Sequence, residues 1–227
     1  MGIIEVFYKP GKLFASLENR RAPWVVPLLL GVLLLLVTTV AAVRMIGMDT
    51  IMRQQLQNTR LSPEQMQTAL DRANSPGVRY ITYASPVVVG TLSILLIAGL
   101  LTLFALIGSK QPKFSTNFSM VALAFFPYRV VTCLMTVLVL VAAPDRSVLD
   151  ISNLLATNAG AFVDKDTMSK GLYALLGSLD ILSFAEIGLL SLGFAKVNRT
   201  GISFGLFAVM SLWVVYVLIR VGFSFLS

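Results

Sequence analysis

Two carboxylates lie within a run of residues that is otherwise apolar enough to cross a bilayer. The run extends from Gly171 to Lys196, and its interior contains Asp180 and Glu186. A carboxylate at that depth costs a few kcal/mol or more unless it is paired, protonated or hydrated. On a helix with about 100° per residue, Asp180, Ser183 and Glu186 share an arc of about 120°, so both acids can face other helices rather than lipid.

Two arginines in other apolar runs are the candidate partners of these acids. With a helical rise of about 1.5 Å per residue, Arg129 lies about 16 Å and Glu186 about 14 Å from the N-terminal side of the membrane. By the same rule, Arg220 lies about 25 Å and Asp180 about 22 Å from that side. Matching the charges by depth therefore predicts the pairs Arg129–Glu186 and Asp180–Arg220.

The residues alone leave three interpretations of this charge network, which consists of Arg129, Asp180, Ser183, Glu186 and Arg220. The pairs could be structural and fix the register and rotation of the helices. They could instead form a polar pathway or an ion- or proton-linked site, since ionisable residues inside membranes often mark transport. The third interpretation is contact with lipid head groups or a partner helix, with Arg220 extending toward the outer interface.

Composition predicts an all-α, polytopic membrane protein and excludes several kinds of chemistry. Of the 227 residues, 56% are hydrophobic and only 13% are charged, whereas a soluble domain has roughly 25% charged residues. The chain has no histidine, and its single cysteine, Cys133, excludes an internal disulfide. A serine–histidine triad or a typical zinc site lacks its components. We therefore expect no catalytic, cofactor-binding or metal-binding residues and no enzymatic activity.

Hydropathy predicts one domain, residues 1–227, with five transmembrane helices. The five spans are expected at about 24–43, 80–107, 118–143, 171–195 and 203–226. The first run exceeds the apolar region of a usual signal peptide, which has about 7–15 residues, so an uncleaved anchor is favoured.

Shorter amphipathic helices are expected outside the spans. Residues 1–23 are too polar to cross and are predicted to lie in the interface, where a disordered tail is the alternative. In the first long loop, Ser62-Pro63-Glu64-Gln65 has the pattern of a helix start with a capping box. In the second, Leu149, Ile151, Leu154 and Leu155 predict another short amphipathic helix.

The net charge of +7 indicates which partners the chain can attract. Most basic residues flank the predicted spans, so we expect the lipid bilayer, and anionic lipids in particular, rather than nucleic acid as the partner. A membrane-protein partner or a homo-oligomer is also consistent with the sequence. The two short turns are purely basic and therefore predict a cytoplasmic N-terminus.

Three stretches resemble the bacterial branch of the Yip-one domain family, relatives of the Ypt/Rab-interacting polytopic membrane proteins. They are residues 6–14 (VFYKPGKLF) followed by 23–27 (PWVVP), residues 113–127, and residues 178–184 (SLDILSF) together with Gly193. The resemblance implies five spans and a non-enzymatic membrane protein, and its bacterial branch implies a bacterial inner (plasma) membrane. In eukaryotes the family is linked to vesicle trafficking and small GTPases. Asp180 fits the family pattern, whereas Glu186 departs from it.

Two functions follow as expectations. The first is an integral membrane protein of an organising or partner-binding type, without chemistry of its own. The alternative is a small ion- or solute-transporting membrane protein that uses the buried charge network. An intramembrane enzyme is disfavoured, because the serines lack a histidine or lysine partner on a helix.

Overall fold

The computed structural model describes residues 2–56, 62–108, 111–164 and 167–225. Within these residues the protein is helical, and no strand is present. This confirms the all-α fold that the composition predicts.

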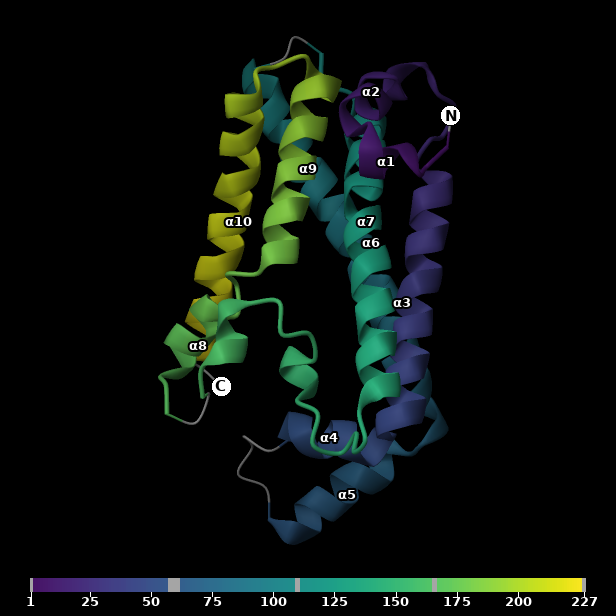
Figure 1. Ribbon diagram of the computed structural model, residues 1–227, viewed down its shortest axis with the longest axis vertical. Coiled ribbons are helices and arrows are strands. Elements are labelled where there is room, and N and C mark those ends of the chain that lie inside the picture. The colour runs from purple at the N-terminus through teal and green to yellow at the C-terminus, as the bar shows by residue number, and fades with distance from the viewer. Residues whose placement is uncertain (1, 57–61, 109–110, 165–166, 226–227) are drawn as a thin grey trace.

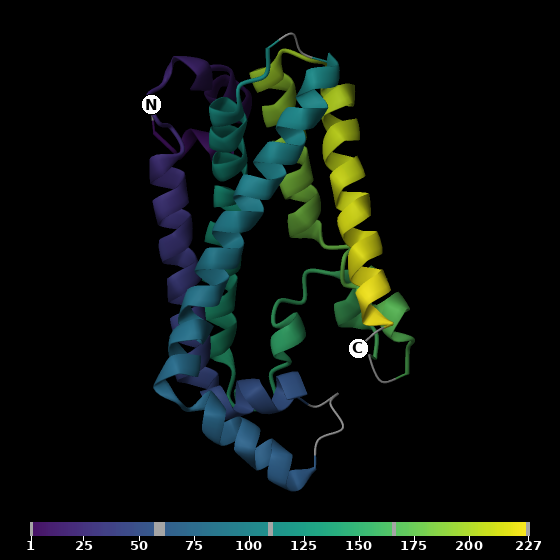
Figure 2. The same cartoon turned by 180° about the vertical axis from the view of Figure 1, so that it is seen from behind.

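Five long helices form the body of the molecule (Figure 1). They are α3 (Val25–Ile46), α6 (Pro76–Gly108), α7 (Phe114–Ala142), α9 (Ile181–Asn198) and α10 (Ile202–Ser224). Each is long and apolar enough to cross a membrane. Helix α6 crosses the others obliquely and approaches α10 only toward one end of the bundle (Figure 2).

The two ends of the bundle carry different elements. One end, here called the N-terminal face, holds residues 2–23 and the turns at 111–113 and 199–201 (Figure 1). The other end, the opposite face, holds helices α4 (Met48–Leu56) and α5 (Pro63–Ala73). The chain therefore begins at the N-terminal face and its last helix runs toward the opposite one.

The N-terminal segment packs onto the bundle rather than only onto the interface. It forms α1 (Glu5–Tyr8), α2 (Pro10–Ala15) and the short helix η1 (Leu17–Asn19). The side chains of Leu13, Phe14 and Leu17 are at most 2% exposed within the main hydrophobic core. Ile4, in contrast, is 66% exposed, and the location of the segment in the membrane interface stays a prediction.

One carboxylate joins this segment to both turns of the N-terminal face. Glu18 forms ion pairs with Lys113 at 2.8 Å and with Arg199 at 3.0 Å. The hydrogen bond and charge of Lys113, followed by the charge of Arg199, hold the pKa of Glu18 below its ordinary value.

At the opposite face the capping box predicted at Ser62 is confirmed. The hydroxyl of Ser62 accepts from the backbone N–H of Gln65 at 3.2 Å, and the Gln65 side chain accepts from the backbone N–H of Ser62 at 2.9 Å. Helix α5 starts at Pro63 as expected. Before it, Gly47 at φ +94° ends α3 and allows the chain to turn directly into α4.

The predicted span at 171–195 is wrong as a continuous helix. The chain forms α8 (Lys170–Leu176), breaks at residues 177–180, and resumes as α9. Asp180 has extended backbone dihedrals at the break and caps α9. The apolar composition of the run conceals this break, because hydropathy averages over a window and does not register a change of backbone direction.

The second long loop stabilises the break. Its predicted amphipathic helix is largely absent, and the described residues of the loop form the short helices η2 (Ile151–Asn153) and η3 (Ala159–Phe162). The backbone N–H of Ala159 donates to the carbonyl of Leu179, and the N–H of Ile181 donates to the carbonyl of Thr157, both at 3.1 Å. These bonds satisfy backbone groups that the interrupted helix leaves free.

Candidate functional site: a polar cavity inside the bundle

The break between α8 and α9 opens onto a cavity of about 750 Å³. Its walls come from α6, α7, α9 and α10, and residues 153–158 of the second long loop complete them. The lining is mainly apolar but includes charged, hydroxyl and aromatic side chains: Ser93, Tyr128, Thr132, Ser178, Asp180, Ser183, Glu186, Trp213, Tyr216 and Arg220. A volume and composition of this kind are typical of ligand-binding pockets.

Asp180 acts as the N-cap of α9. Its carboxylate accepts from the backbone N–H of Leu182 at 3.4 Å and of Ser183 at 3.2 Å, and from the Ser183 hydroxyl at 2.9 Å. A carboxylate in this position also interacts favourably with the positive end of the helix dipole. The helix terminus therefore provides the compensation that the sequence assigned to Arg220.

Arg220 reaches the same break but bonds to different atoms. Its Nη1 donates to the carbonyl of Gly177 and to the hydroxyl of Ser178, each at 3.1 Å. Among the residues that the structure describes, no ion pair joins Arg220 to Asp180. The predicted pair is therefore wrong, because Arg220 stabilises the backbone of the break instead.

Arg129 lies outside the cavity, between α3, α6 and α7. Its guanidinium is buried, and Nη2 donates to the carbonyl of Gly90 at 3.2 Å. A methyl group at Gly31 would lie 2.6 Å from Nη1, and one at Gly90 would lie 3.3 Å from Nη2. The two glycines thus make room for the cation, and its side chain contacts their helices rather than α9.

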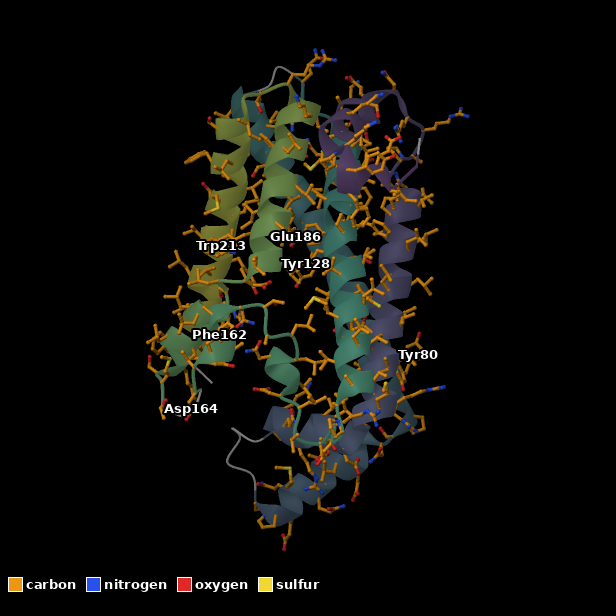
Figure 3. The ribbon with its side chains drawn as sticks, viewed as in Figure 1. Tyr80, Tyr128, Phe162, Asp164, Glu186 and Trp213 are labelled. Atoms are coloured by element: carbon orange, nitrogen blue, oxygen red, sulfur yellow. The ribbon has the colours of Figure 1, made fainter. Side chains whose placement is uncertain are left out.

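Glu186 therefore lacks the partner that the sequence predicted. No ion pair or hydrogen bond to Arg129 occurs in the described part of the chain, although the two charges attract each other through space. Its Oε1 is buried and has no hydrogen-bond partner. Figure 3 shows Glu186 from α9 beside Tyr128 from α7, and both side chains line the cavity.

The structure brings together Asp180, Ser183, Glu186 and Arg220 around one cavity and separates Arg129 from them. Sequence reasoning missed the aromatic members, Tyr128, Trp213 and Tyr216. Tyr128 precedes Arg129, so a rotation of about 100° on α7 places it on a different face of the helix. The cavity can hold a polar or charged group within an otherwise apolar volume. The buried Oε1 of Glu186 is available to accept a hydrogen bond from such a group.

The chain matches the model of the Yip1 domain family over residues 4–225. Because the match covers nearly the whole chain, the protein belongs to this family. No curated protein and no solved structure matches it significantly. Together with five apolar helices, family membership identifies an integral membrane protein.

Proposed function

We propose that this Yip1 family member organises or binds partners within the membrane and performs no chemistry of its own. The supporting observation is that the wall of the polar cavity toward the N-terminal face is apolar and buried. There its walls include Leu101, Ile187 and Leu190, which are at most 7% exposed. Beyond them, Phe14 and Phe194 belong to the same hydrophobic core. A cavity that is closed at this end favours binding over passage through the bundle.

The partners in this proposal are lipids and at least one membrane protein. A second copy of the chain could be that protein. Lys9, Lys12 and Arg21 are exposed on the N-terminal face and can contact anionic lipid head groups. We place this face in the cytoplasm because the short turns at this face are basic. The resemblance to the bacterial branch of the family favours a bacterial inner membrane. The whole chain would then act as one domain.

Transport is the second candidate function, and the charged lining of the cavity is the observation that favours it. Asp180, Glu186 and Arg220 all border the same internal space. For transport, the apolar end of the cavity would have to open in a second conformation, so that the site is reached from each side in turn.

Flux measurements distinguish the two functions. Purified protein is reconstituted into liposomes, and proton and cation flux are compared with protein-free liposomes and with Glu186→Gln. We expect no flux above the protein-free background for either protein. Flux that is present in the natural protein and absent in Glu186→Gln would overturn the proposal and favour transport.

Purification from native membranes tests the binding function. With lipid retained in nanodiscs, the proposal predicts a partner protein or a second copy in a fixed ratio. A chain that is always recovered alone and monomeric would contradict it.

A further inference from the structure

The cavity has an opening on the lipid-facing surface of the bundle. Leu96 on α6 and Tyr216 and Ile219 on α10 line it, and they are also 63%, 55% and 53% exposed. Helices α6 and α10 approach each other near the N-terminal face and diverge toward the opposite face (Figure 2). A lipid in the leaflet at the opposite face can therefore reach the cavity laterally between α6 and α10.

The charged groups of the cavity lie at two depths. With about 1.5 Å of rise per residue, Arg220 lies about 27 Å from the N-terminal end of α10, and Glu186 lies about 18 Å from the same end of α9. Since the hydrocarbon layer is about 30 Å thick, Arg220 is close to the opposite interface. Glu186 lies deeper, and its Oε1 is a buried acceptor without a donor.

The two groups differ in what they can bind. Arg220 uses Nη1 for the carbonyl of Gly177 and the hydroxyl of Ser178, and no other bond from its guanidinium occurs among the described residues. Its remaining donors suit a phosphate. The carboxylate of Glu186 requires a group that donates hydrogen bonds, and a cationic donor would also balance its charge. Tyr128 and Trp213 add aromatic rings to the lining of the same cavity.

We propose that the cavity binds the head group of a phospholipid with a primary ammonium group, such as phosphatidylethanolamine. The phosphate lies at Arg220 near the interface, and the ammonium group extends to Glu186. A primary ammonium is preferred over a quaternary one because only the former donates hydrogen bonds to the carboxylate. The acyl chains leave between α6 and α10 and remain in the bilayer.

Native mass spectrometry of the purified full-length protein tests the site by titration with three phospholipids. These are phosphatidylethanolamine, phosphatidylcholine and phosphatidylglycerol with the same acyl chains. We expect phosphatidylethanolamine to bind at least about tenfold more tightly, because a charge-assisted hydrogen bond is worth about that factor. Equal binding of the three lipids would overturn the proposal.

Two variants locate the binding. Glu186→Gln should reduce the preference for phosphatidylethanolamine by about tenfold. Glu5→Gln is the matched control, since Glu5 is also a buried carboxyl with an unpartnered oxygen but lies in α1, outside the cavity. The control should keep the preference. Loss of the preference in both variants, or in neither, would contradict a site at Glu186.

A second measurement needs no variant. Progressive N-methylation of phosphatidylethanolamine should weaken binding to the natural protein step by step as donors are lost. Soluble phosphoethanolamine contains the same head group without acyl chains and should compete weakly. Competition as strong as that of the lipid would assign the site to a soluble amine and overturn the assignment to a phospholipid.

Discussion

At the residue scale, the main finding is that each buried charge has a different environment from the one that depth matching predicts. Asp180 caps a helix, Arg220 binds the backbone of the break, and Arg129 fits between Gly31 and Gly90. Depth along the bilayer is only one coordinate. The direction in which a side chain points around its helix decides its contacts. The depths of Arg129 and Glu186 do not determine that direction.

Because Asp180 caps α9, we expect its hydrogen-bond acceptor to contribute more to the free energy of unfolding than its charge does. Asp180→Asn keeps an N-cap acceptor and should cost less than about 1 kcal/mol of unfolding free energy. Asp180→Ala removes the acceptor and should cost about 0.5–2 kcal/mol. The measurement is unfolding of the purified protein in mixed micelles. A loss of about 3–5 kcal/mol in Asp180→Asn would instead indicate a buried ion pair with Arg220.

At the element scale, local patterns predict helices well where the signal is a specific motif. Ser62 and Gln65 predict both the start and the cap of α5, and the structure contains both. A related signal was available at the break, because Gly177-Ser178 precedes Asp180 and Ser183 follows three residues later. The surrounding run is apolar enough to be counted as one span, and this conceals the signal. The backbone pairing of residues 157–159 with 179–181 could not be predicted, because it is non-local.

The contact between α9 and α10 depends on a glycine. A methyl group at Gly205 would lie 2.5 Å from the backbone carbonyl oxygen of Ser191. Gly205→Ala should therefore separate the two helices and cost about 1–3 kcal/mol of unfolding free energy. Gly222→Ala on the same helix meets nothing within 4 Å and serves as the control. Equal stability of the two variants would show that α9 and α10 do not approach this closely.

At the scale of the whole molecule, the N-terminal segment connects the elements of the N-terminal face through Glu18, Lys113 and Arg199, here called the clasp. Glu18 joins η1 to Lys113 before α7 and to Arg199 after α9. These contacts connect three distant parts of the chain, and they could not be inferred from the sequence because each is a pair of exposed charges among many.

The clasp predicts a dependence on pH. The pKa of Glu18 is lowered in the folded protein, so its stabilising contribution is complete above the ordinary Glu value of about 4.3 and is lost as the pH falls through the lower, folded pKa. Hydrogen exchange of residues 5–19 should accelerate in that acidic range, after correction for intrinsic rates. The acceleration should be smaller in Glu18→Gln and unchanged in Glu64→Gln, an exposed carboxyl on α5. An identical response in all three proteins would exclude the clasp.

The central claim is that the polar cavity is closed toward the N-terminal face, and cysteine accessibility tests it most directly. Ser183→Cys places a thiol in the cavity lining, and Cys133→Ala removes the buried natural cysteine. A membrane-impermeant thiol reagent is added to sealed vesicles of each orientation. We expect no labelling from the N-terminal face, because the buried side chains of Leu101, Ile187 and Leu190 line the cavity on that side. Labelling from the N-terminal face would contradict it and show that the cavity can open there.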